Sequence, residues 1–388
     1  MTISTLHRFP FVEHVVLGKP AAAVVLEEIE RLGRRRIFMI TTASLARGSL
    51  LNAVKDALGS RLVGSFAGVT AHGPRQAVLD GARAIRAADA DILLAVGGGS
   101  VIDATKVMQL CLRHKLDRPD QLSDHVARGR AEPSTRPSDA DDWIRAIAVP
   151  TTLSAAEFTW FGGAYDPERR VKESFTNAMM MPQVIVMDPT MTLETPPRLL
   201  FSTGMKAVDH AAERLASLQP NPYNEAVSSL ALQLLAGGLR KVQQNPTDIG
   251  ARADLQYGAY LSMCGGWAGG TVGLSHALGH ALGAHCGVAH GETTGVVLPA
   301  VMRWNAPNNS GRQNLIAQAM GRADGDAASA LTELIVGLNL PCRLHEVGVQ
   351  RDSFGAIAAK AMNDPLTKNN PRPVTSPEDI EAVLELAS

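Results

Sequence analysis

The sequence has few cysteines, few aromatic residues and almost no net charge. Its four cysteines are scattered and include no Cys-x-x-Cys pair, which argues against a disulfide framework and favours a reducing compartment. The net charge of −1 argues against nucleic acid or an anionic membrane as the main partner. No apolar run approaches the ~18–20 residues of a membrane span, and the first residues lack a secretory pattern. We therefore expect a cytoplasmic protein that acts on neither nucleic acid nor a membrane.

Length and composition are those of a globular protein with more than one core. The 388 residues are 45% apolar and 19% charged, and a chain of this length usually forms about two domains. In the first half, β-branched runs alternate with stretches of helical spacing, which predicts βαβ units and a parallel sheet. The predicted strands are residues 14–18, 36–41, 61–66, 91–96, 144–149 and 183–187. The predicted helices are residues 21–32, 49–58, 75–88 and 100–113.

The pattern changes in three places further along the chain. Residues 115–142 are polar and contain three prolines, so we predict a long surface loop there. Residues 160–164 and 170–176 flank a turn and predict a β-hairpin. After Asp188-Pro189 the spacing is helical almost throughout. The sequence thus predicts an α/β domain over residues 1–188 and a helical domain over residues 189–388.

A glycine-rich loop follows the apolar strand predicted at residues 91–96. Gly97, Gly98 and Gly99 allow positive φ and a close approach of the backbone to a ligand, and Ser100 opens the next helix. The N-terminus of a helix offers N–H groups and a positive dipole end to a pyrophosphate. The motif is neither GxGxxG nor GxxxxGK[ST], so it supports neither the ordinary Rossmann fingerprint nor an ATPase. We favour phosphate binding over a purely structural turn.

A second polar cluster follows the strand predicted at residues 144–149. Thr151, Thr152 and Ser154 lie just past its end. In an open parallel sheet, ligands bind outside the carboxyl ends of the strands. These hydroxyls are therefore candidates to bind phosphate or ribose, and capping of the loop is the alternative.

Histidines are concentrated in one stretch of the second half. His276, His280, His285 and His290 fall within fifteen residues, and His276 and His280 share a helical face at i, i+4. We expect glycines 283 and 287 to end that helix and His290 to begin the next one, which allows His290 to fold back towards His276. This density favours a functional site. His285 is expected at the surface.

A second helix is expected to face these histidines. It carries His210, with Lys206 at the i−4 position on the same face. A divalent metal site would have a carboxylate there instead of a cation. Asp209 lies about 100° round the helix from His210, so the two are not expected to bind one ion. The alternative for Lys206 is a surface position or a salt bridge to Asp209 or Glu213.

Five stretches match a known family in order and spacing. They are GGGSVIDATK at 97–106, VPTTLSAAEFT at 149–159, VIVMDPTMT at 184–192, STGMKAVDHAAE at 202–213 and the histidine-bearing stretch at 273–305. On these residues the chain resembles the iron-containing (group III) alcohol dehydrogenases. The sequence His-Gly-Glu-Thr at 290–293 favours the maleylacetate reductase branch.

The resemblance implies a fold and a cofactor. The fold is an α/β N-terminal dinucleotide-binding domain with a parallel sheet plus an all-α C-terminal domain, the dehydroquinate synthase-like/group III alcohol dehydrogenase fold. The cofactor is NADH or NADPH. Its pyrophosphate would lie on Gly97, Gly98, Gly99 and Ser100, with Asp103 near the nicotinamide, Thr151, Thr152 and Ser154 along the adenine side, and Lys172 at a ribose. Many relatives carry an Asp that favours NAD at the position of Thr42, so a 2′-phosphate would not be repelled here.

The resemblance also implies a reaction. Metal-dependent members bind their ion with an Asp and three His, whereas this chain has His210, His276 and His290 with Lys206 at the Asp position. We therefore expect a homodimeric reductase of a small acidic oxo-enoic acid, such as maleylacetate to 3-oxoadipate, that needs no metal. Lys206 and these histidines would stabilise the enolate oxygen, and His280 would donate the proton.

Three alternatives stay open. The first is a metal-dependent alcohol dehydrogenase or aldehyde reductase, with an ion on His210, His276 and His290. The second is a non-redox lyase on the same scaffold, although the phosphate-binding basic cluster that it needs is not found in the sequence. The third is a non-catalytic protein that retains the cofactor fold.

Overall fold

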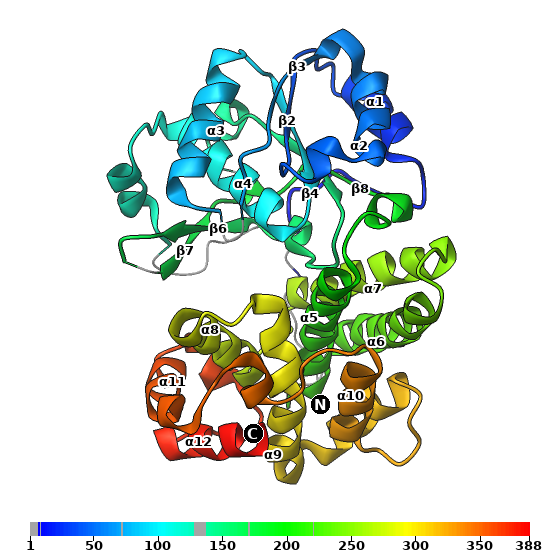
Figure 1. Cartoon of the computed structure of the whole chain (residues 1–388), viewed down its shortest axis with the longest axis vertical. Coiled ribbons are helices and arrows are strands. Elements are labelled where there is room, and N and C mark those ends of the chain that lie inside the picture. Colours follow the sequence, from blue (N-terminus) through cyan, green and yellow to red (C-terminus); the bar gives the residue numbers. More distant parts are fainter. Residues whose placement is uncertain (1–6, 8, 71–72, 128–136, 170, 220) are drawn as a thin grey trace. The chain divides into compact units, whose positions relative to one another are not determined.

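Figure 1 shows the computed structural model of the chain. It describes residue 7 and residues 9–70, 73–127, 137–169, 171–219 and 221–388, and for His290 the backbone alone. The chain forms two compact units, Arg8–Thr195 and Pro196–Ser388, the second together with His7. We predicted a division after residue 188, and the two units divide just behind the 3-10 turn Pro189–Thr192.

The first unit is built on a six-stranded parallel sheet. The strand order is β1-β8-β5-β4-β2-β3, and every neighbouring pair is parallel. The strands are β1 His14–Leu17, β2 Ile37–Ile40, β3 Leu62–Phe66, β4 Ile92–Gly97, β5 Ala146–Pro150 and β8 Val184–Met187. The predicted strands and the predicted parallel sheet are confirmed, with ends that differ by a residue or two.

Helices cover both faces of this sheet. They are α1 Ala21–Arg31, α2 Ser49–Leu58, α3 Arg75–Ala87 and α4 Gly99–His114, as predicted. On β4, Ile92, Leu94 and Val96 share a core with α1 and α2, whereas Leu93 and Ala95 share a second core with α3 and α4. Successive side chains of a strand point to opposite faces. Burial on both faces explains why β4 reads as a continuous apolar run.

Two segments of this unit lie outside the large sheet. The predicted hairpin is confirmed as β6 Phe161–Asp166 paired antiparallel with β7 Val171–Thr176, and Arg170 lies outside the described residues. The prediction of a surface loop over residues 115–142 is wrong for part of that segment. Leu122 and Ala140 lie in the same core as α3 and α4, because 3-10 turns turn the chain back there. Residues 128–136 lie outside the described part of the chain.

Regular structure in the described residues of the second unit is entirely helical, as predicted. The long helices are α5 Pro197–Ala216, α6 Pro222–Gln244, α7 Ile249–Trp267, α8 Leu274–Cys286, α9 His290–Ala319, α10 Ala327–Gly337, α11 Phe354–Met362 and α12 Pro377–Leu386. Helix α5 packs against α6, α7, α8 and α9, and nearly all its side chains beyond the first turn are buried. Within the described ranges, we find no helix long and apolar enough to cross a bilayer.

The turn between α8 and α9 is the one that the sequence indicated. Gly287 follows α8 with φ of 70°, a conformation that glycine adopts at little cost, and α9 begins at His290. Gly283 was also expected to end the helix, and it lies inside α8 instead. A glycine within a helix costs only about 1 kcal/mol, which packing offsets.

A buried lysine joins α4 to the segment between β5 and β6. The Nζ of Lys106 donates to the carbonyl of Ala156 at 2.6 Å, the hydroxyl of Thr159 at 2.8 Å and the carbonyl of Phe161 at 2.9 Å. Burial lowers the pKa of Lys106 to about 8. Glu157 is buried in the same segment, and its Oε2 has no hydrogen-bond partner among the described residues. Burial raises the pKa of Glu157 to about 7.

This pKa of Glu157 predicts a pH-dependent stability. The pKa rises from 4.5 in the unfolded chain to about 7 in the folded chain, so the folded state binds more protons between these values and loses stability as the pH rises. Glu157→Gln removes this loss. We expect the stability of the variant relative to wild type to increase by roughly 1–3 kcal/mol between about pH 5 and pH 8. Urea titrations at the two pH values measure it, and a constant difference would contradict the prediction.

Candidate functional site

The glycine loop and the polar cluster after β5 lie side by side in the first unit. Gly97 of β4 pairs with Pro150 of β5, and the N–H of Thr151 donates to the carbonyl of Gly97 at 3.1 Å. A Cβ on Gly98 would lie 2.8 Å from Cγ2 of Thr152. A Cβ on residue 99 would likewise lie 2.9 Å from the hydroxyl of Ser154. The glycine loop is therefore closely packed against Thr152 and Ser154. A side chain at residue 98 or 99 would displace them, so both positions need glycine.

The loop opens a long helix. Gly98 is the N-cap of α4 and has an extended backbone. The positive end of the helix dipole therefore lies at the carboxyl edge of the sheet, where dinucleotides bind in open α/β folds. Asp103 and Lys172 form an ion pair of 3.0 Å, with Lys172 reaching from β7 across Gly163. Thr42 follows the end of the adjacent strand β2, with its hydroxyl 3.0 Å from that of Ser44.

The packing of the loop gives a test of its role. Gly98→Val would force Thr152 out of place and move the α4 N-terminus, so we expect the dissociation constant for NADH to rise at least about tenfold. A titration of nicotinamide fluorescence measures it. Gly237→Ala is the matched control, because a Cβ at that position in α6 meets nothing within 4 Å. Unchanged affinity in Gly98→Val would contradict the assignment.

In the second unit, Lys206 is buried and paired. Its Nζ lies 2.9 Å from Oδ2 of Asp209, a carboxyl with 0% exposure, and the hydroxyl of Thr294 donates to the same oxygen at 3.0 Å. Burial opposes the ionisation of Asp209, but the neighbouring His276 and Lys206 outweigh it and hold the pKa below its usual range. The salt bridge to Asp209 that the sequence left as an alternative is therefore present. Lys206 is not an isolated cation.

His276 is held by a second carboxylate. Its Nδ1 lies 2.6 Å from Oε2 of Glu213 and 3.4 Å from Oδ2 of Asp209. Its Nε2 is buried and has no hydrogen-bond partner among the residues that the structure describes. Burial lowers the pKa of His276, which favours the neutral ring near neutral pH. The free Nε2 is thus the atom that a ligand would meet.

The other predicted histidines lie differently. The ring of His210 stacks on that of His276, with centroids 5.1 Å apart and an interplanar angle of 24°. The side chain of His280 is 51% exposed and its Nδ1 lies 2.8 Å from Asp364, so it does not join the buried cluster. His285 is exposed, as expected. The side chain of His290 lies outside the described part.

The sequence analysis offered Asp209 as a partner of Lys206, but it missed the contact of Glu213 with His276 and the contact of Thr294 with Asp209. Asp209 and Glu213 follow Lys206 at i+3 and i+7 on α5, so the spacing alone places all three on one face. Thr294 gives no comparable signal, because its contact with Asp209 spans 85 residues.

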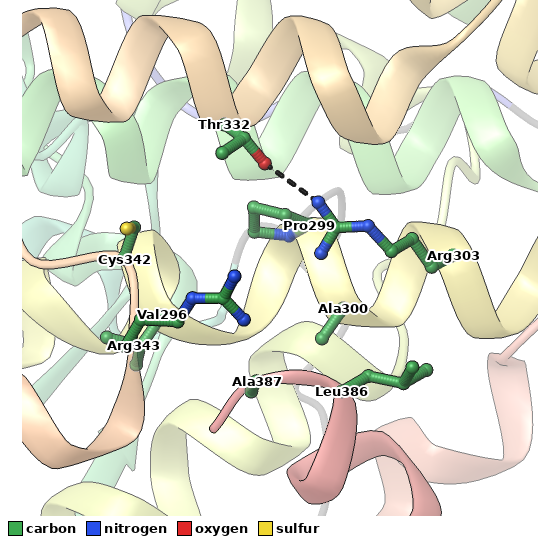
Figure 2. A pocket seen from close by; sticks show the side chains of 9 residues that line it. All are labelled: Val296, Pro299, Ala300, Arg303, Thr332, Cys342, Arg343, Leu386 and Ala387. Carbon is green, nitrogen blue, oxygen red and sulfur yellow. Dashed lines mark hydrogen bonds between the residues drawn. The ribbon is translucent and has the colours of Figure 1, made fainter.

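The hollow drawn in Figure 2 is a different feature of the second unit. Residues of α9, α10 and α12 line it with Cys342 and Arg343, and Arg303 donates to Thr332 at 3.2 Å. None of the residues singled out from the sequence lines this hollow, and its two arginines are exposed.

Together, the two units have the makeup of an oxidoreductase with a dinucleotide loop in one unit and a buried histidine cluster in the other. Two family models match the chain. The model described as iron-containing alcohol dehydrogenase matches residues 13–189, and the model of the C-terminal part of the Fe-containing alcohol dehydrogenase family matches residues 200–388. The chain therefore belongs to the iron-containing alcohol dehydrogenase family, as the motifs indicated.

Individual relatives differ in the substrates that their names give. A maleylacetate reductase of Sphingobium indicum is 30% identical over 98% of this chain and 95% of its own. A lactaldehyde reductase of Escherichia coli is 28% identical over 94% of this chain and 95% of its own. The crystal structure of a maleylacetate reductase from Agrobacterium tumefaciens covers 100% of this chain and 98% of its own, with 27% identity and a TM-score of 0.82. These matches confirm the predicted fold and an oxidoreductase of this family.

The name of the family implies iron, and a divalent ion would have to find its ligands in this cluster. Such an ion takes three or more N or O donors. Among the described side chains, Asp209 is engaged by Lys206 and Thr294, and an ammonium occupies the position of the expected carboxylate. Asp209, Glu213 and His276 each bring one possible ligand atom within 4.8 Å of the others. While Lys206 lies on Oδ2 of Asp209, its ammonium would repel a divalent ion at these atoms, so the set fits such an ion only if Lys206 moves away.

Proposed function

We propose that this chain reduces a small oxo-enoic acid with NADH or NADPH, as in the reduction of maleylacetate to 3-oxoadipate, without an obligatory metal. The observation that carries the proposal is the buried ammonium of Lys206, which shares Oδ2 of Asp209 with the ring of His276. The names of the maleylacetate reductases among the relatives support the choice of acceptor.

The chemistry follows from the donors on this chain. A bound NAD(P)H supplies the hydride to the conjugated double bond. Electron density then moves onto the carbonyl oxygen, where the N–H groups of Lys206 stabilise the enolate by hydrogen bonds. Protonation of the carbon next to the carbonyl completes the reduction. Lys206 has three N–H donors and uses one on Asp209 in the described structure. Because Asp209 neutralises its charge, Lys206 acts through these directed donors instead of as the isolated cation that the sequence suggested.

A metal-dependent alcohol dehydrogenase or aldehyde reductase is the second candidate. The observation that favours it is the pair formed by His276 and Glu213, because metal-binding histidines commonly donate their other ring nitrogen to a carboxylate. In that case Lys206 would have to leave the position that it occupies. Elemental analysis of the purified protein, with activity measured before and after chelation, separates the two candidates.

A substitution of Lys206 tests the first candidate. We expect Lys206→Met to lower kcat/KM for the oxo-enoic acid about a hundredfold or more, since a buried donor to the developing oxyanion is lost. Affinity for NADH and the far-ultraviolet circular dichroism should stay unchanged. Lys241→Met is the matched control, because Lys241 is an exposed lysine of the same unit. An enzyme that survives Lys206→Met, or that dies on chelation and revives with zinc or iron, would refute metal-free reduction.

Thr42 gives a test of the choice of cofactor. A carboxylate at this position would repel a ribose 2′-phosphate, so we expect Thr42→Asp to raise KM for NADPH by about tenfold more than KM for NADH. Thr42→Asn supplies the matched uncharged control. Equal changes for both cofactors in Thr42→Asp would show that the 2′-phosphate lies elsewhere.

A further inference from the structure

We propose that Lys206 keeps divalent metal ions out of the buried cluster, and that removal of its ammonium opens a metal site formed by Asp209, Glu213 and His276. The inference rests on the metal-free part of the proposed function, whereas the choice of acceptor does not enter it. Only His276 is shared with the ligand set that the resemblance to iron-containing alcohol dehydrogenases implied.

Three buried side chains bring one possible ligand atom each to the same place. The ligand atoms of Asp209, Glu213 and His276 lie within 4.8 Å of one another, and these residues are at most 6% exposed. Two carboxylate oxygens and one imidazole nitrogen are donors that zinc and similar divalent ions accept. Three protein ligands are also the usual number for an ion that holds a water molecule in its fourth position.

The distances within this set suit a tetrahedral ion after one adjustment. Bonds of about 2.0–2.2 Å at tetrahedral angles place neighbouring ligand atoms roughly 3.3–3.6 Å apart. Oδ2 of Asp209 lies 3.4 Å from Nδ1 of His276, within this range. Oε2 of Glu213 lies closer to Nδ1, at 2.6 Å, because a hydrogen bond joins the two atoms. An ion that replaces the shared proton would require them to separate by about 1 Å or less.

Asp209 has an oxygen that no described donor satisfies. Its Oδ2 accepts from Lys206 and Thr294, whereas its Oδ1 is buried and has no hydrogen-bond partner among the described residues. A buried carboxylate oxygen without a donor is costly, and buried carboxylates are commonly satisfied by a bound cation. This oxygen is therefore an observation, separate from the spacing of the ligands, that points to a cation at the cluster.

The ammonium of Lys206 prevents an ion from using these ligands. Nζ lies 2.9 Å from Oδ2 of Asp209. An ion about 2.1 Å from that oxygen would lie no more than about 5 Å from Nζ. Two positive groups repel each other strongly at this distance in a protein interior, because the interior screens charge less than water does. The cluster can therefore hold the ammonium or the ion, but not both.

Removal of the ammonium leaves the carboxylates without their cation. Among the described residues, Asp209 would keep the hydroxyl of Thr294 and its contact with His276, and Glu213 would keep two backbone N–H donors at the start of α8. Two buried carboxylates without a cation are costly, and a divalent ion would neutralise both. Lys206→Met suits the test, because the side chain of methionine ends one atom short of Nζ and leaves that position empty.

The test is zinc binding by the full chain, measured by isothermal titration calorimetry after treatment with a chelator. Because the repulsion is removed, we expect Lys206→Met to bind one Zn²⁺ per chain at least about a hundredfold more tightly than wild type. A wild type that binds zinc as tightly as Lys206→Met would overturn the proposal, and so would a folded Lys206→Met that gains no affinity.

A matched control accounts for zinc bound elsewhere on the chain. Lys241→Met removes an exposed lysine of the same unit, so it should bind zinc as weakly as wild type does. All three proteins carry the same surface histidines, and zinc bound by these appears equally in each titration. A gain in Lys241→Met as large as that in Lys206→Met would contradict a site at the cluster.

Second substitutions in the Lys206→Met chain identify the ligands. Asp209→Asn and His276→Gln each remove one proposed ligand, so either change should lower the zinc affinity of Lys206→Met by at least about tenfold. Glu225→Gln is the control in the same background, because it breaks an ion pair with Arg312 outside the cluster. Zinc affinity that survives both ligand changes would refute this ligand set.

Thermal unfolding covers a variant that folds poorly. A ligand that binds only the folded state raises the melting temperature. Zinc should therefore raise the Tm of Lys206→Met and leave that of wild type unchanged, and a variant that is unfolded without zinc should fold when zinc is added. A Lys206→Met chain that stays unfolded in the presence of zinc would overturn the proposal, because the ion would then not replace the ammonium.

Zinc titration and turnover separate the failure of each idea. A wild-type chain that reduces no oxo-enoic acid refutes the proposed function, while zinc binding by Lys206→Met stands or falls by itself. A chain that reduces the acid without metal, and whose Lys206→Met variant gains no zinc affinity, refutes the metal site alone.

Discussion

Helix α5 buries charged side chains on one face, and the surrounding helices must supply their partners. An unpaired charge in a protein interior costs several kcal/mol, so Lys206, Asp209 and Glu213 are tolerated only because each is paired. The partners come from outside the helix as well as from within it. Thr294 of α9 and the start of α8 donate to the two carboxylates. The positions of α8 and α9 on α5 are therefore coupled to the ionic state of the cluster.

The two buried lysines, Lys106 and Lys206, differ in how many of their N–H donors are used in hydrogen bonds. Lys106 uses all three donors on acceptors of a single segment, so it holds α4 to that segment and has nothing left for a ligand. Lys206 uses one donor on Oδ2 of Asp209, the same oxygen that lies 3.4 Å from Nδ1 of His276, and Nε2 of that ring has no partner among the described residues. Groups that are fully satisfied stabilise a fold, whereas buried groups with unused capacity are candidates for binding. By this criterion the cluster on α5, and not the lysine of α4, is the candidate for the chemical site.

The sequence predicted the fold well because the fold depends on local patterns. Alternation of apolar strands and amphipathic helices, and a glycine loop between two of them, are visible without any long-range contact. The sequence predicted where the histidine cluster lies along the chain, but not which side chains contact one another in it. The i, i+4 rule grouped His280 with His276, yet the structure pairs His280 with Asp364 at the surface, a contact that spans 84 residues. The role of Glu213 depends on partners 60 to 63 residues away, which spacing along one helix cannot reveal.

The pairing of Lys206 with Asp209 changes the electrostatic argument that the sequence suggested. A lysine in place of a carboxylate looks like the addition of a fixed positive charge, but a buried lysine without a counter-ion would lose its proton more easily. Asp209, three residues further on, pairs with Lys206, and its negative charge cancels the field of the lysine at a distance. Glu213 adds a negative charge, although two backbone N–H groups at a helix N-terminus offset part of it. The cluster therefore does not attract acidic acceptors by net charge. Under the proposed function, selection among acceptors would then depend on the direction of the remaining donors, since one fold can serve different substrates.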